Sequence, residues 1–133
     1  MSDLGHNRHR ARERSLEILY ESTIKDRPVA TVMTELRARP EAYVVELLTS
    51  ATEHQIRANE LISEFSIDWP LERIALVDRL IMTLAVGEML KEDGPPVAII
   101  LDEAVELAKS YSTEASSSFV NGVLSSVARR LFE

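Results

Sequence analysis

An Asn-Gly pair, Asn121-Gly122, lies inside a run of apolar residues near the C-terminus. Asn-Gly between apolar residues usually marks a β-hairpin turn. Here the apolar residues recur at intervals of three and four, which is the spacing of one face of a helix. They are Phe119, Val120, Val123, Leu124, Val127 and Leu131. A glycine inside a helix costs about 1 kcal/mol relative to alanine, so we expect another backbone or a ligand to approach Gly122 closely.

The same helical spacing runs through the whole chain, and no segment alternates in the way of a strand. The sequence therefore predicts an all-α fold, and 133 residues suffice for one domain with one core. The segment from Val77 to about Glu92 is apolar on most sides, so we expect this helix to lie centrally. Ser112-Thr113 offers an N-cap for the last helix, with Glu114 in its first turn. The other expected helices are a first one with a stripe of Leu16, Leu19, Tyr20 and Thr23, a short one between Pro28 and Pro40, one from Val44 to Phe65, and one from Val97 to Ala108.

Charge is distributed unevenly along this acidic chain. The net charge is −7, yet residues 1–14 carry four arginines against two acidic residues. The remaining residues hold 11 basic and 20 acidic side chains, a charge of −9. A basic segment on an acidic body indicates two partners, one anionic and one basic, although charge alone equally allows a solvated tail. We divide the chain into a basic N-terminal arm, residues 1–9, and a single helical domain, residues 10–133.

Residues that commonly carry catalysis or bind metals are scarce. There is no cysteine, which excludes a disulfide, a cysteine zinc site and a cysteine nucleophile. His6 and His9 have the spacing of two metal ligands, but no third ligand is fixed nearby. The four glycines are scattered singly, so there is no phosphate-binding loop. We therefore expect a protein that is not an enzyme and holds neither a metal nor a cofactor.

No segment has the composition of a signal peptide or a membrane span. Residues 1–14 are polar and basic, without an apolar core. The longest apolar stretch, Leu80 to Leu90, is too short for a bilayer, and charged residues flank it closely. We expect a cytoplasmic protein, with which the absence of cysteine is compatible.

Two blocks of residues resemble the NusB family of bacterial transcription antitermination factors. The first block is Arg10-Ala11-Arg12-Glu13, followed by Leu19-Tyr20. In the family the second block is a proline, an apolar run, Asn or Asp, Glu-Ala-x-Glu-Leu-Ala-Lys, an aromatic residue, and later Phe-Val-Asn-Gly-Val-Leu. Here it comprises Pro96, Ile99, Leu101, residues 102–109, Tyr111 and residues 119–124. The resemblance implies a NusB-like fold of two small helical subdomains, divided near Trp69-Pro70.

The resemblance also implies a function. Members of the family are non-catalytic RNA-binding adaptors that bind boxA-like RNA together with NusE, a ribosomal protein of the small subunit. The complex joins elongating RNA polymerase through other Nus factors and opposes termination, chiefly on ribosomal RNA operons. We expect the same partners for this chain.

Expected site residues follow from the resemblance and from the chemistry of RNA, which needs cations for phosphates and flat faces for bases. The expected RNA-binding residues are Arg8, Arg10, Arg12, Tyr20, Tyr111, Ser118 and Phe119. Asp78 and Glu88 match acidic positions of the family and are the expected NusE-binding residues. Each aromatic residue taken alone is more often part of a core, and either acidic residue taken alone is equally well explained as ordinary surface charge.

The chain departs from the family pattern at several positions near this expected site. Ala115 replaces an acidic residue in the loop before the last helix, and Glu17 stands where Gln is common. Val97-Ala98 replaces a Tyr-Lys pair, Ala75-Leu76 stands where Asp-Pro is frequent, and Gly87 replaces a tyrosine. These departures bear on the RNA sequence preference and on the NusE contact, and leave the expected fold unchanged.

Two other functions remain open on the sequence alone. One is a helical protein–protein interaction module in which the arginines have no role, and a salt titration of RNA binding would separate it. The other is a stand-alone NusB-like domain related to ribosomal RNA cytosine methyltransferases. Such an enzyme would need a C-terminal Rossmann-like domain, whereas this chain ends at Glu133. A homodimer is also left open, because an apolar stripe looks the same within one subunit and between two.

Overall fold

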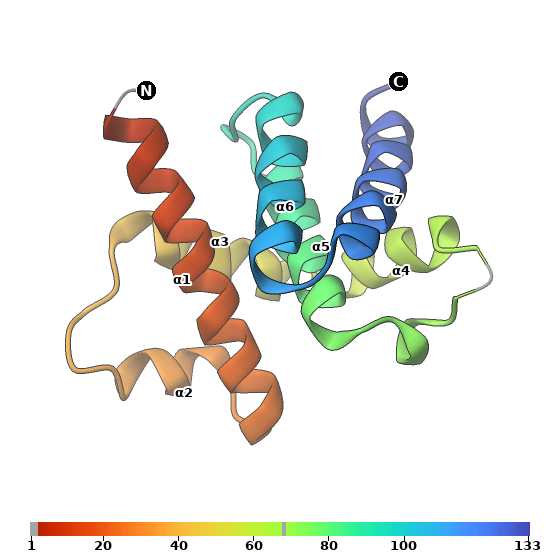
Figure 1. The fold of residues 1–133 in the computed structure, drawn as a ribbon. Coiled ribbons are helices and arrows are strands. Elements are labelled where there is room, and N and C mark those ends of the chain that lie inside the picture. Colours follow the sequence, from red (N-terminus) through yellow and green to blue (C-terminus); the bar gives the residue numbers. More distant parts are fainter. Residues whose placement is uncertain (1–2, 68) are drawn as a thin grey trace.

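The computed structural model describes residues 3–67 and 69–133. All regular secondary structure in these residues is helical, without a β-strand (Figure 1). The all-α prediction is confirmed. The elements are α1 (Asp3–Lys25), α2 (Val29–Thr34), α3 (Ala42–Glu53), α4 (Gln55–Phe65), the 3₁₀ turn η1 (Leu71–Arg73), α5 (Leu76–Met89), α6 (Val97–Tyr111) and α7 (Glu114–Phe132). No helix in the described residues is long and apolar enough to cross a membrane.

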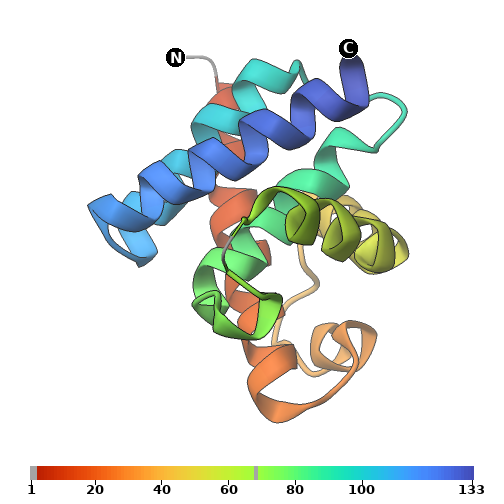
Figure 2. The ribbon, with the colours of Figure 1, turned by 90° about the vertical axis from the view of Figure 1, so that its right-hand side faces the viewer.

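Helix α5 lies at the centre of the fold, as its apolar sequence predicts. Residues 80–89 are all buried, and the helix packs against α1, α3, α4, α6 and α7. Helices α1, α2 and α3 form one group, and α4, α6 and α7 form a second, in which α6 and α7 run side by side (Figures 1 and 2). These two groups are the two small helical subdomains, and α5 is the element that they share. The chain does not divide near Trp69-Pro70 as expected, because α4 precedes these residues and packs against α7.

Helices α3 and α5 approach each other closely at Gly87. A Cβ atom at this position would lie 3.0 Å from the backbone N and Cα atoms of Ala51 in α3. Because a side chain at Gly87 would collide with this backbone, glycine allows the crossing. Tyrosine, which the family pattern has at this position, would force the two helices apart.

Gly122, by contrast, lies on an exposed face of α7. A Cβ atom there would meet no neighbouring atom within 4 Å. The expectation that another backbone approaches Gly122 is therefore wrong. The apolar residues around it, such as Val120, Val123 and Leu124, are buried as their spacing predicts.

Residues 3–9 form the first turns of a long helix rather than a separate arm. Helix α1 begins at Asp3, so the boundary expected after residue 9 falls inside it. Side chains of these turns have partners on other helices. The guanidinium of Arg8 lies 4.6 Å from the ring centre of Tyr43 in α3, and Nδ1 of His9 lies 2.7 Å from Oε2 of Glu103 in α6. These contacts explain why a polar segment folds onto the domain.

The single helix expected from Val44 to Phe65 is in fact two helices. The chain bends at His54, where φ is −103° and ψ is 15°, and the bend separates α3 from α4. Helix α3 packs against α1, α4 packs against α7, and both contact α5. One straight helix could not pack against both α1 and α7. Local apolar spacing does not show that the chain must bend to make both contacts.

The expected N-cap fixes the short turn between α6 and α7. Oγ1 of Thr113 accepts a hydrogen bond from the backbone N–H of Ser116 at 3.0 Å, and Glu114 lies in the first turn of α7. The predicted cap is therefore confirmed. The turn holds Tyr111 at the end of α6 and places Phe119 in the second turn of α7.

Replacing Gly87 and Gly122 by alanine, one at a time, tests the close crossing at the first and the exposed position of the second. Gly87→Ala should lower the free energy of unfolding, because overpacking typically costs about 1–3 kcal/mol and opposes the better helix propensity of alanine. Gly122→Ala should raise it by up to about 1 kcal/mol, because only the propensity changes. Urea denaturation followed by circular dichroism measures both variants. A stabilised Gly87→Ala variant would contradict the close crossing of α3 and α5.

Candidate functional site

Arg12 and Glu88 form a buried ion pair between α1 and α5. Nε of Arg12 donates to Oε1 of Glu88 at 2.9 Å, and Nη2 donates to Oε2 at 2.6 Å. The two side chains are only 5% and 3% exposed. Nη1 of Arg12 donates a further hydrogen bond to Glu103 in α6 at 3.2 Å. Bidentate, charge-assisted pairs of this kind are among the strongest hydrogen-bonded contacts between side chains.

The pair is part of a buried charge cluster, defined here as Arg12, Glu88, Glu103, Tyr43 and His9. The hydroxyl of Tyr43 in α3 donates to Oε2 of Glu88 at 2.5 Å, and His9 contacts Glu103. Burial of the Tyr43 hydroxyl and its bond to Glu88 raise the pKa of Tyr43 well above its ordinary value, so it remains a donor. The cluster thereby joins α1, α3, α5 and α6.

The buried charge cluster corrects two expectations from the sequence. Arg12 is expected to meet RNA phosphates and Glu88 to meet NusE, but both are buried against each other. Burial lowers the pKa of Arg12, yet the hydrogen bond and the charge of Glu88 outweigh it and raise the pKa above its ordinary value. The guanidinium is therefore charged and occupied inside the protein. Neither side chain is accessible to a partner in this structure.

Two tyrosines are exposed on neighbouring helices, and their surface is called the tyrosine face below. Tyr20 on α1 is 42% exposed, and Tyr111 at the end of α6 is 38% exposed. The hydroxyl of Tyr111 donates to Glu17 of α1 at 3.2 Å, which holds Tyr111 beside α1, one turn from Tyr20. Burial of the hydroxyl, the charge of Glu17 and this bond raise the pKa of Tyr111 to about 12. Both rings are open to a flat ligand, and Arg10 is exposed on the same helix as Tyr20.

Two other expected residues, Asp78 and Phe119, line one hollow of about 270 Å³ at the start of α5. Asp78 is 5% exposed, and its Oδ1 has no hydrogen-bond partner. A buried carboxylate oxygen without a partner is costly, so this hollow suits a ligand that brings a donor group. The other lining residues are Trp69, Arg73, Ile74, Ala75, Ala115 and Ser116.

Sequence reasoning missed Trp69 and Arg73 at this hollow. Trp69 is 51% exposed, and Arg73 ends the 3₁₀ turn that leads to α5. The available signal was the only tryptophan of the chain, placed next to Pro70 and outside any apolar stripe. Exposed tryptophan and arginine are enriched at binding interfaces, so both residues belong to the candidate site.

Ser118 and Arg8 lie apart from these residues. Ser118 is exposed and lines a different hollow, on α6 and α7, where Asp102 and Glu106 are among its neighbours. Carboxylates on this surface repel phosphate. Arg8 is half-buried over the ring of Tyr43. The residues expected to bind RNA therefore do not form one continuous surface.

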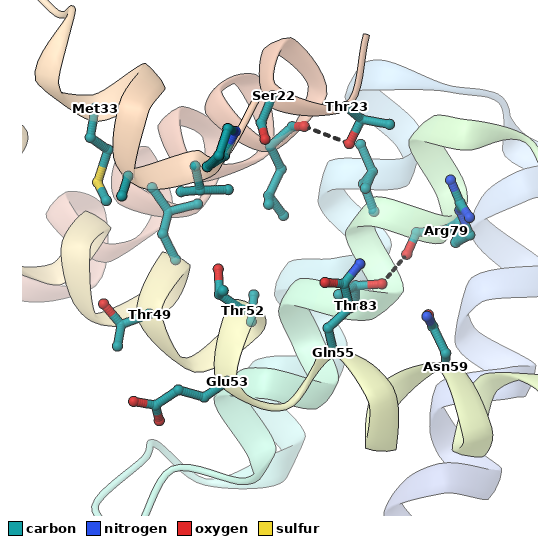
Figure 3. Close-up of a pocket in the computed structure, with 17 residues that line it drawn as sticks. Ser22, Thr23, Met33, Thr49, Thr52, Glu53, Gln55, Asn59, Arg79 and Thr83 are labelled. Atoms are coloured by element: carbon teal, nitrogen blue, oxygen red, sulfur yellow. Dashed lines mark hydrogen bonds between the residues drawn. The ribbon is translucent and has the colours of Figure 1, made fainter. Parts of the chain in front are cut away.

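A cleft of about 480 Å³ lies where α1, α2, α3, α4 and α5 meet (Figure 3). The only charged side chains among its described lining residues are Glu53 and Arg79, which Figure 3 shows on opposite sides of the cleft. The hydroxyls of Thr23 and Thr83 donate at 2.9 Å to backbone oxygens of their own helices. The cleft thus assembles no acid–base pair. The described side chains also contain no group of three His, Asp or Glu residues that could hold a metal ion.

The fold and the site are those of a helical binding protein, with exposed tyrosine rings and a buried carboxylate oxygen that has no hydrogen-bond partner among the described residues. A model of the NusB family matches residues 9–129. The transcription antitermination protein NusB of Thermobifida fusca is 41% identical over 123 residues, covering 90% of this chain and 87% of that protein. NusB of Bacillus velezensis is 38% identical over 122 residues, covering 90% and 94%. The chain belongs to the NusB family.

Solved structures share the fold. T. maritima NusB matches 92% of this chain and 90% of its own, with a TM-score of 0.81 and 31% identity. A structure of antitermination factors NusB and NusE in complex with double-stranded RNA matches 92% of this chain and 96% of its own. Its TM-score is 0.79 at 23% identity, so this second likeness bears on the fold alone.

Breaking the buried ion pair should be far more costly than breaking an exposed pair on the same helix. Arg12→Met leaves Glu88 buried without its counter-ion, so we expect the free energy of unfolding to fall by about 3–5 kcal/mol. Arg14→Met removes the exposed pair with Glu17 and should cost less than about 1 kcal/mol. Urea denaturation compares the two variants. Equal, small losses would show that the buried charge cluster does not stabilise the fold.

Proposed function

We propose that this NusB-family protein is a non-catalytic, cytoplasmic adaptor of transcription antitermination that binds boxA-like RNA together with NusE. The complex joins elongating RNA polymerase through other Nus factors, chiefly on ribosomal RNA operons. The tyrosine face carries this proposal, because Tyr20 and Tyr111 are exposed rather than part of the core. The family structure that holds NusB, NusE and double-stranded RNA supports this pair of partners.

RNA binding uses the tyrosine face and the cations near it. Bases stack on Tyr20 and Tyr111, and Arg10 neutralises a phosphate. The hydrogen bond from Tyr111 to Glu17 orients the ring before RNA arrives, which lowers the entropy lost on binding. Phe119 lines the same hollow as Asp78, which is assigned to NusE below, so its ring meets RNA only where the RNA borders NusE. Arg8 contributes long-range charge, and Ser118, which carboxylates surround, has the weakest support.

NusE binding uses the hollow that contains Asp78. A basic partner can place a lysine or arginine side chain in this hollow, where its charge is attracted by the buried carboxylate of Asp78, whose Oδ1 has no hydrogen-bond partner. Trp69 at the edge of the hollow supplies the large, exposed ring that commonly anchors a protein interface. Glu88 takes no direct part, because Arg12 already occupies it.

The alternative of a pure protein–protein module explains the hollow but not the tyrosine face. Two tyrosines are exposed on different helices, and the hydroxyl of Tyr111 is bound to Glu17, one turn before Tyr20. Stacking of splayed bases is the interaction for which such rings are suited in RNA-binding proteins. RNA binding therefore explains both features together.

Stacking on Tyr20 can be tested with a matched pair of variants. Tyr20→Ala should weaken the binding of boxA-like RNA by about 1–3 kcal/mol, since the base loses its ring. Tyr20→Phe retains the ring and should bind RNA as the unchanged protein does. Fluorescence anisotropy with labelled RNA at fixed salt measures both affinities. An equal loss in the two variants would assign the contact to the hydroxyl instead of the ring.

RNA and NusE should bind cooperatively. The acidic body repels RNA, and NusE covers part of it with basic surface, so each ligand should tighten the other by about 1–3 kcal/mol, and by the same factor in both directions. Asp78→Asn should weaken NusE binding and leave the RNA affinity of the isolated protein equal or slightly higher. Titrations of RNA with and without saturating NusE measure the coupling. If NusE leaves the RNA affinity unchanged, the protein–protein module becomes the better explanation.

A further inference from the structure

A cleft of about 670 Å³, called the arginine cleft below, lies between α1 and the connection from α2 to α3, residues 35–41. Figure 1 shows this connection beside α1, at the left edge of the molecule. Four arginines line the cleft, two from each wall. Arg10 and Arg14 come from α1, and Arg37 and Arg39 come from the connection. The fold therefore places two further arginines beside the two from α1. The charge count of residues 1–14 includes only Arg10 and Arg14.

Ion pairs leave a surplus of positive charge in the arginine cleft. Two of its three carboxylates are neutralised, because Glu21 lies 3.2 Å from Nζ of Lys25 and Glu35 lies 2.7 Å from Nη1 of Arg27. Among the described residues, the charged side chains of the cleft without an ion pair are three exposed arginines and one exposed glutamate. They are Arg10, Arg37, Arg39 and Glu41. This surplus stands out on a chain whose net charge is −7.

Contacts along α1 connect the arginine cleft to the tyrosine face. Nη1 of Arg14 lies 3.3 Å from Oε1 of Glu17. The other carboxylate oxygen of Glu17 accepts the hydrogen bond from Tyr111. An RNA strand with a base stacked on Tyr111 would therefore lie within one turn of α1 from Arg14, which lines the arginine cleft.

The chemistry of the cleft suits a repeating anion. A guanidinium binds two oxygens of one phosphate, and arginines on facing walls can hold successive phosphates of one strand. No aromatic residue is among the described lining residues, so the cleft offers no platform for bases. It therefore fits the sugar–phosphate backbone and is indifferent to base sequence.

We propose that the arginine cleft holds the backbone of the RNA segment that continues from the bases stacked on Tyr20 and Tyr111. This inference rests on the proposed function and extends its RNA site across α1 to Arg37 and Arg39. RNA that extends beyond the tyrosine face gains affinity through phosphate contacts alone. The gain does not depend on the sequence of the added nucleotides and falls steeply with salt.

The test compares a short boxA-like RNA with the same RNA extended at either end by a uridine tract. The variant Arg37→Gln/Arg39→Gln removes two cations that make no ion pair, so its stability should not change. The charge-matched control, Arg129→Gln/Arg130→Gln, removes two cations from the last turn of α7, on the opposite side of Figure 1. Arg130 lies 3.8 Å from Glu64, but both side chains are exposed, so the loss of this pair should cost less than about 1 kcal/mol. Anisotropy titrations over a range of salt concentrations give the affinity and the salt slope for each pair.

For the extended RNA, Arg37→Gln/Arg39→Gln should weaken binding and flatten the log–log salt slope by about 1.4, since each phosphate contact to a single strand contributes about 0.7. The short RNA should bind this variant as tightly as it binds the unchanged protein, and the control should retain the gain in affinity from extension.

Equal losses of affinity in variant and control, or no gain in affinity from extension, overturn the inference while the proposed function stands. If neither RNA binds the unchanged protein, both this inference and the proposed function are overturned. Polyglutamate that binds as tightly as the extended RNA, with the same sensitivity to Arg37→Gln/Arg39→Gln, would assign the cleft to an acidic protein instead.

Discussion

The ion pair between Arg12 and Glu88 holds α1 against α5 and thereby influences which residues of α1 are exposed. A buried ion pair loses the hydration of both charges, so it is stable only when further hydrogen bonds satisfy the remaining groups. Glu103 and Tyr43 supply those bonds here. The pair directs one side chain of α1 inward and, together with the buried residues Leu16, Ile18 and Leu19, fixes the rotation of this helix about its axis. Every other residue of α1 then faces a defined neighbour or the solvent.

The fixed rotation divides the four N-terminal arginines into two kinds. Residues four apart lie on the same face of a helix, so Arg8 and Arg12 face Tyr43 and Glu88 inside the protein. Arg10 and Arg14 lie on another face and line the arginine cleft. A charge count treats the four residues as one basic arm. The helical period, once α1 is known to begin at Asp3, shows that Arg8 and Arg12 pack against other helices, whereas Arg10 and Arg14 are exposed, Arg14 in a pair with Glu17.

Features set by local sequence could be predicted, and features set by tertiary contact could not. Most of the helices, the central position of α5 and the cap at Thr113 follow from apolar spacing and capping chemistry, which act within a few residues. The bend at His54, which separates α3 from α4, does not. Gly87 and Gly122 are both glycines in helices, and only the crossing with Ala51 distinguishes them. The hollow around Asp78 depends on how η1 and α7 come together. The family resemblance supplied Tyr20, Tyr111 and Asp78 as candidates, but not the burial of Glu88 or the contribution of residues 35–41.

The acidic residues of α1 explain why RNA binding by such a chain must be local and dependent on a partner. Glu17 and Glu21 lie between the cations of this helix and are paired with Arg14 and Lys25. Each pair cancels its own charge, so it neither attracts nor strongly repels a phosphate. Net attraction then comes only from the few arginines without a carboxylate partner, while the rest of the acidic body repels RNA at long range. Under the proposed function, the rings of the tyrosine face orient the RNA, and a basic protein bound at the hollow with Asp78 would reduce the remaining repulsion. The distribution of paired and unpaired charges would then couple the two ligands through electrostatics, without requiring a change in the fold.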